Sequence, residues 1–175
     1  MKKTIITTSL FFFISIGTLF AQGNDHNSGN FQTEITELIE SYLVLKDALV
    51  DSDADDALSA ASQMQEQLDS IGEHRLEGDD HMKWMDTYRK IDFELSEIFS
   101  TNNLDEIREH FYNLSETLIE SVKDFGIKGV VYHQHCPMAF NNEGGSWLSN
   151  EDLVMNPYMP DTMLRCGRVI EKIES

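Results

Sequence analysis

The chain has 175 residues, with 31 Asp and Glu against 13 Lys and Arg, and its formal net charge is −18. A chain this acidic lacks the positive surface that holds a phosphate backbone, so nucleic acid is excluded as a partner. The length suits one domain with a hydrophobic core.

The first 21 residues have the pattern of an export signal, because Lys2 and Lys3 precede an apolar stretch that ends on the small residue Ala21. This stretch is short for a membrane span, and no second apolar run of that length follows. We therefore expect cleavage after Ala21, rather than an uncleaved anchor, and a periplasmic or secreted protein without a membrane span. Residues 22–30, rich in Gly, Asn and Ser, are predicted to form a flexible linker.

Residues 31–126 contain four stretches in which apolar residues recur at steps of three and four, as on one face of a helix. The four sets are Phe31, Ile35, Leu38, Tyr42, Leu45 and Leu49; Ala54, Ala57, Ala61, Met64, Leu68 and Ile71; Trp84, Tyr88, Ile91, Leu95 and Ile98; and Leu104, Ile107, Phe111, Leu114, Leu118 and Phe125. Asp53 and Asn103 are typical helix caps, and Gly126 is a typical stop. Four such faces can be buried together only around one core, so the sequence predicts an all-α fold, an antiparallel four-helix bundle.

Helical bundles often hold cofactors, but the usual ligand patterns are missing. No His has a Glu three residues before it, which argues against a carboxylate-bridged di-metal site, and there is no Cys-x-x-Cys-His for covalent haem. Cys136 precedes a proline and lacks a helix start that would lower its pKa, which argues against a nucleophilic role. We therefore expect no enzymatic activity.

Residues 127–175 differ in composition, because they hold all three prolines and both cysteines of the chain. We expect a small, turn-rich unit packed on the bundle, with residues 130–135 extended and one or two helical turns around residues 160–167.

Soft metal ligands gather in this unit. Pro137 favours an extended Cys136, which would align it with Met138, and Met163 and Cys166 are spaced to share one face of a helical turn. Thiolates and thioethers together suit Cu(I) better than they suit Zn(II) or a hard cation. The expected ligands are Cys136, Met138, Met163 and Cys166, with His135 and then His133 in reserve.

The spacing leaves two other interpretations open. Two cysteines in an exported protein often form a disulfide, here Cys136–Cys166, with the methionines as core residues of a structural or interaction module. The two thiols could also be unrelated.

Short motifs recur in order along this unit. They are Cys136-Pro137-Met138-Ala139, Gly145-Ser146-Trp147-Leu148-Ser149, Asn156-Pro157-Tyr158 and Met163-Leu164-Arg165-Cys166-Gly167. These motifs resemble a bacterial family catalogued as domain of unknown function 3347, and residues 107–118 resemble the family's Arg-x-x-Phe-x-x-Leu-Ser helix. One departure is Met159-Pro160, where the family usually has an aromatic or small residue and Gly.

The resemblance implies an exported protein that handles copper or another heavy metal, since the same domain is attached to periplasmic adaptor subunits of heavy-metal efflux pumps. We therefore expect a non-catalytic soft-metal binder in metal homeostasis or efflux. Cu(I) is the first choice of metal, zinc or another heavy metal is the alternative, and an efflux pump adaptor is a candidate partner.

Overall fold

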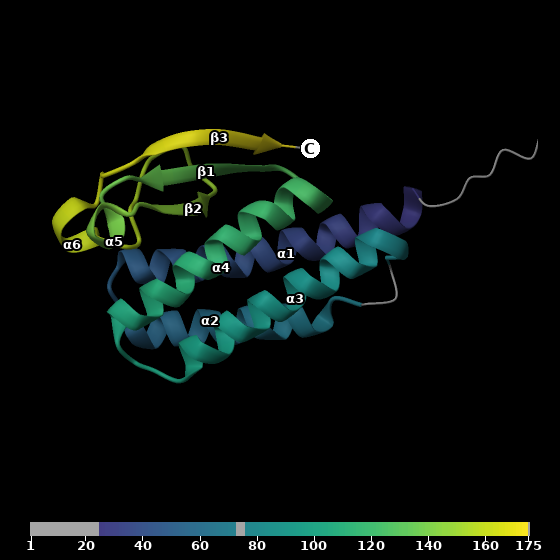
Figure 1. The fold of residues 1–175 in the computed structure, drawn as a ribbon, viewed down its shortest axis with the longest axis horizontal. Coiled ribbons are helices and arrows are strands. Elements are labelled where there is room, and N and C mark those ends of the chain that lie inside the picture. The colour runs from purple at the N-terminus through teal and green to yellow at the C-terminus, as the bar shows by residue number, and fades with distance from the viewer. Residues whose placement is uncertain (1–24, 73–75, 175) are drawn as a thin grey trace, which may run out of the picture.

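The computed structural model describes residues 25–72 and 76–174, in which four long helices are followed by a small antiparallel sheet (Figure 1). The elements are α1 (Asp25–Val50), α2 (Ala54–Ser70), α3 (Gly78–Phe99), α4 (Leu104–Phe125), β1 (Val130–Cys136), α5 (Ala139–Asn142), β2 (Gly145–Ser149), α6 (Pro160–Met163) and β3 (Arg168–Glu174). The predicted export signal, residues 1–21, lies outside the described residues. Within the described part of the chain, no helix is both long and apolar enough to cross a membrane.

The four long helices confirm the helical part of the predicted fold. Helix α1 contacts α2 and α4, and α3 contacts the same two helices, so the four enclose a common core. The predicted apolar faces supply most of this core: the whole first set is buried, and Trp84, Phe111 and Leu114 are completely buried. Further buried residues lie beside the predicted faces of α1 and α4 and widen them. Ile39 and Ile119 are among these residues.

The predicted caps form as expected. The Asp53 carboxylate accepts a hydrogen bond from the Asp56 N–H at 2.9 Å, and the Asn103 side chain accepts one from the Asp105 N–H at 3.0 Å. Gly126 ends α4 with a φ of 79°, a left-handed conformation that glycine adopts without strain. Short connections after Val50 and Phe99 reverse the chain between α1 and α2 and between α3 and α4.

The boundary of the predicted linker is wrong at its C-terminal end. Helix α1 begins at Asp25, so residues 25–30 are helical rather than part of a linker. Once the buried face that starts at Phe31 has nucleated the helix, adding further turns is inexpensive even for polar residues.

The all-α assignment is also too narrow, because the C-terminal unit contains a sheet with the strand order β2-β1-β3. Strand β1 confirms the predicted extended segment and pairs antiparallel with both neighbours. Strand β3 was not foreseen, since almost all of its side chains are exposed and no buried face marks it in the sequence. The short turn α5 contains Phe140 and Asn141 with positive φ values of 50° and 59°.

The sheet packs on the bundle through β2 and α4 (Figure 1). The buried Tyr42 hydroxyl of α1 is hydrogen-bonded to the Ser115 hydroxyl of α4 at 2.7 Å and accepts the Leu148 N–H of β2 at 3.2 Å. Burial raises the pKa of Tyr42 well above its ordinary value, so this phenol stays protonated and can serve both partners. One side chain thus links two helices to the strand that lies beside the cysteines.

Candidate functional site

The fold brings the two cysteines together from opposite ends of the C-terminal unit. Cys136 is the last residue of β1 and is completely buried, whereas Cys166 follows α6 and is partly exposed. Their thiols lie close enough for Cys136 to raise the pKa of Cys166, and neither is in a disulfide. This pair is the centre of the candidate site.

The neighbouring thiol controls the acidity of Cys166. Its pKa is raised by the hydrogen bond and the negative charge that Cys136 presents and by partial burial, while the backbone N–H of Met138 acts in the opposite direction. Two thiols this close cannot both ionise without mutual repulsion. Cys166 therefore holds its proton more tightly than an isolated thiol does, unless a cation or a bond between the sulfurs replaces that proton.

The backbones of the two methionines lie next to Cys166, by routes that differ from the predicted one. Met138 is not aligned with Cys136 along a strand, because β1 ends at Cys136 and Met138 has helical φ and ψ of −99° and −8°. Proline restricts the residue before it and leaves the residue after it free to turn. The Met138 backbone nonetheless contacts the Cys166 sulfur, and its side chain is 43% exposed.

Met163 is tied to Cys166 through the backbone. It is the last residue of α6, its side chain is partly buried, and its carbonyl accepts the Cys166 N–H at 2.9 Å. The predicted helical turn at residues 160–163 is thus present, although it is only one turn long.

Both histidines lie on the other face of β1, because neighbouring residues of a strand alternate between faces. His135 Nδ1 is 3.1 Å from the Ser146 hydroxyl, and its ring lies against Gly144. Both ring nitrogens of His133 are buried without a hydrogen-bond partner, and its pKa is lowered by burial and by Lys123. The histidines therefore do not face the two thiols.

No group of three or more Cys, His, Asp or Glu side chains that could hold a metal is present in residues 25–72 and 76–174. The two cysteines alone fall short of the three or four ligands that zinc usually takes from such side chains. Two-thiolate coordination with thioether support is within the chemistry of Cu(I).

Trp147 underlies the chain just after Cys166. It is completely buried, packs edge-on against Tyr158 with ring centroids 5.8 Å apart, and lies so close to Gly167 that a Cβ there would come within 3.1 Å of the indole. It therefore supports the backbone beside the thiol pair.

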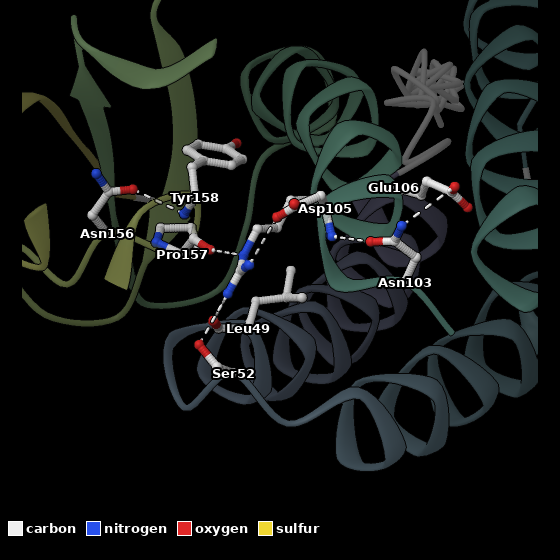
Figure 2. Close-up of polar contacts among 9 residues, drawn as sticks. Leu49, Ser52, Asn103, Asp105, Glu106, Asn156, Pro157 and Tyr158 are labelled. Atoms are coloured by element: carbon white, nitrogen blue, oxygen red, sulfur yellow. Dashed lines mark hydrogen bonds and ion pairs between the residues drawn. The ribbon is translucent and has the colours of Figure 1, made fainter. Parts of the chain in front are cut away.

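Sequence reasoning missed the residues that hold the loop next to the turn of Cys166. Arg108 and Asn156 are both buried, and Figure 2 shows the polar contacts that join α4, the end of α1 and the Asn156–Tyr158 loop. The available signal was that each belongs to a motif of the resemblance, the helix motif and Asn-Pro-Tyr. Their individual roles could not be read from spacing, because their partners are distant in the sequence.

Comparison with known proteins identifies the family. The sequence model for "Protein of unknown function (DUF3347)" matches residues 38–129, which is more than half of the chain. The protein belongs to this family. The match covers α1 from Leu38 through α4 and ends before β1, so the cysteine motifs lie beyond it. Neither the curated proteins nor the solved structures include a significant match.

Proposed function

We propose that this DUF3347 protein is an exported, non-catalytic binder of a soft metal ion, with Cu(I) as the preferred ion. The observation that supports it is the adjacency of Cys136 and Cys166, which places two potential thiolates side by side at the end of the central strand β1. Met138 and Met163 are the proposed supporting thioether ligands, with His135 and His133 moved to a secondary role. An antiparallel four-helix bundle is the proposed scaffold.

The chemistry of the pair favours binding over turnover. Cys166 has a raised pKa, which is the opposite of what a nucleophilic cysteine needs, and no cation is hydrogen-bonded to either sulfur among the described contacts. Two adjacent thiolates repel each other. A bound soft cation offsets this repulsion, so metal binding stabilises the ionised form of the pair.

The test is a competitive Cu(I) titration of the reduced protein against a chromophoric chelator. Cys136→Ser and Cys166→Ser should each abolish tight binding, whereas Met138→Leu and Met163→Leu should weaken it less, because a neutral thioether contributes less than a thiolate. Zn(II) should bind more weakly than Cu(I), and Mg(II) should not compete. Unchanged Cu(I) affinity in the Cys136→Ser, Cys166→Ser double variant would end the proposal.

The same adjacency supports a second candidate, a structural or interaction module that is closed by a Cys136–Cys166 disulfide. Its formation would join the two sulfurs and pass two protons and two electrons to a disulfide-bearing oxidant. Counting free thiols in protein taken directly from the periplasm separates the candidates, since metal binding requires both thiols reduced.

The cellular setting remains part of the proposal. Export rests on the N-terminal signal pattern, and a role in heavy-metal efflux beside a pump adaptor rests on the resemblance of the cysteine motifs. Mass spectrometry of the mature protein should find Gln22 as the first residue. Intact Met1 in a membrane fraction would contradict export by cleavage.

A further inference from the structure

The turn that carries Cys166 is held by hydrogen bonds from one buried residue, Asn156. Asn156 is completely buried; its backbone N–H donates to the Leu164 carbonyl at 2.9 Å, and its side-chain Nδ2 donates to the Met163 carbonyl at 3.5 Å. The Met163 carbonyl also accepts the Cys166 N–H at 2.9 Å. Asn156 and Cys166 therefore converge on the same carbonyl.

The loop that holds Asn156 is itself anchored to the helices by Arg108 (Figure 2). The Arg108 Nε donates to the Pro157 carbonyl at 2.9 Å, and Nη2 donates to the Leu49 carbonyl at 3.2 Å and to the Ser52 hydroxyl at 3.0 Å. A planar guanidinium can serve acceptors from several elements at fixed angles. The Asn156–Tyr158 loop is thus held at the ends of α1 and α4.

The chain on the other side of Cys166 is equally confined. Gly167 has a φ of 136°, and a Cβ there would come within 2.9 Å of the His135 carbonyl of β1. Only glycine lets the backbone pass this close to the strand that ends in Cys136. Cys166 is therefore held between a close approach to β1 and the turn fastened by Asn156.

We propose that Asn156 is a positioning residue of the thiol pair, which sets the separation of the Cys136 and Cys166 sulfurs, and that Arg108 fixes Asn156 to the bundle. The proposal deepens the soft-metal function, on which its metal-binding consequence depends. The positioning itself does not depend on metal, because it concerns the two sulfurs alone.

The experiment measures thiol–disulfide exchange of the full chain with glutathione. One glutathione disulfide and the protein dithiol give the protein disulfide and two glutathione thiols, and the equilibrium constant is the effective concentration of one protein thiol at the other. Asn156→Ser keeps a short acceptor for the Tyr158 N–H but cannot reach the Met163 carbonyl. It should lower the effective concentration about fivefold, the factor that one hydrogen bond contributes.

Arg108→Lys is the second and milder variant, because lysine cannot serve the three acceptors at once; it should lower the effective concentration about twofold or more. If Asn156→Ser does not fold, the result for Arg108→Lys decides whether the proposal stands. Two controls should leave the value unchanged. Asn150→Ser alters an exposed Asn of the same unit, and Leu68→Ala destabilises α2, which lies on the far side of the bundle from the sheet (Figure 1).

An effective concentration that is unchanged in folded Asn156→Ser, or in Arg108→Lys where Asn156→Ser does not fold, would overturn the proposal. A fall as large in Leu68→Ala would also overturn it, because the effect would then report stability rather than position. Cu(I) affinity should fall in parallel by about fivefold in Asn156→Ser. If the parent protein binds no Cu(I), the metal function fails, while the exchange equilibrium still tests the positioning.

Discussion

The two thiols of the pair have different surroundings although they lie close together. Cys136 is completely buried at the end of β1, whereas Cys166 is partly exposed beside the half-exposed Met138. An incoming ion or reagent would therefore meet Cys166 and Met138 first. The raised pKa of Cys166 means that proton loss is the step that controls what the pair can bind.

Cu(I) binding should weaken as the pH falls. Each thiolate must lose a proton before it coordinates, and the raised pKa of Cys166 keeps that proton on the sulfur to a higher pH than in a free cysteine. The apparent affinity should fall by up to about tenfold per pH unit for each thiol that is protonated. Chelator competition between pH 8 and pH 6 measures the slope. A flat profile would exclude thiolate ligation.

His133 predicts a pH-dependent stability at the contact between the sheet and α4. Burial lowers its pKa below the ordinary value of 6.5, so the folded state binds this proton less readily than the unfolded state does. The stabilisation by neutral His133 is therefore complete above about pH 6.5 and is lost as the pH falls below it. Urea unfolding at pH 7.5 and 5.5 should show a smaller loss in His133→Leu than in the parent. Equal losses would contradict this.

At the scale of elements, the long helices could be predicted because each has a local pattern in the sequence. Apolar residues at steps of three and four mark a buried face, and Asp53, Asn103 and Gly126 mark ends with side-chain or backbone chemistry that needs no distant partner. Strand β3 has no such pattern, since Val169 and Ile170 are exposed. Its extended conformation comes from pairing with β1. Strand pairing is a long-range property that spacing does not encode.

Tyr42→Phe tests how the sheet is attached to the helices. The substitution removes the hydroxyl that bonds Ser115 and accepts the Leu148 N–H. Ser115 still donates to the Phe111 carbonyl, but the buried Leu148 N–H is left without this acceptor. It should lower the free energy of unfolding by about 1–3 kcal/mol, as measured by urea denaturation. Tyr132→Phe on β1, whose side chain is only half-buried, is the control and should change stability by less than about 0.5 kcal/mol. Equal effects would show that the Tyr42 hydroxyl does not hold the sheet.

For the whole molecule, the candidate site is a consequence of tertiary structure. The sequence predicted a set of soft donors, but the alignment expected for Met138 is wrong, because the chain turns directly after β1. The meeting of Cys136 with Cys166 depends on Asn156 and Arg108, whose partners lie in other elements. The family match covers most of the helical scaffold and stops before these motifs.

Metal binding should appear as stability of the entire fold, because Cys136 belongs to the core and Cys166 closes the C-terminal unit. A ligand that binds only the folded state, at a free concentration 100 times its dissociation constant, adds about 2.7 kcal/mol to the free energy of unfolding. This raises the melting temperature of a protein this size by about 5–10 °C.

We expect this shift with Cu(I) or Ag(I) added to reduced protein, a smaller one with Zn(II) and none with Mg(II). The Mg(II) arm controls for loose attraction of cations to the acidic surface. The shift should vanish in the Cys136→Ser, Cys166→Ser double variant, as followed by circular dichroism. A shift that persists in that variant would place the ion elsewhere and leave the disulfide-closed module as the better account of the two cysteines.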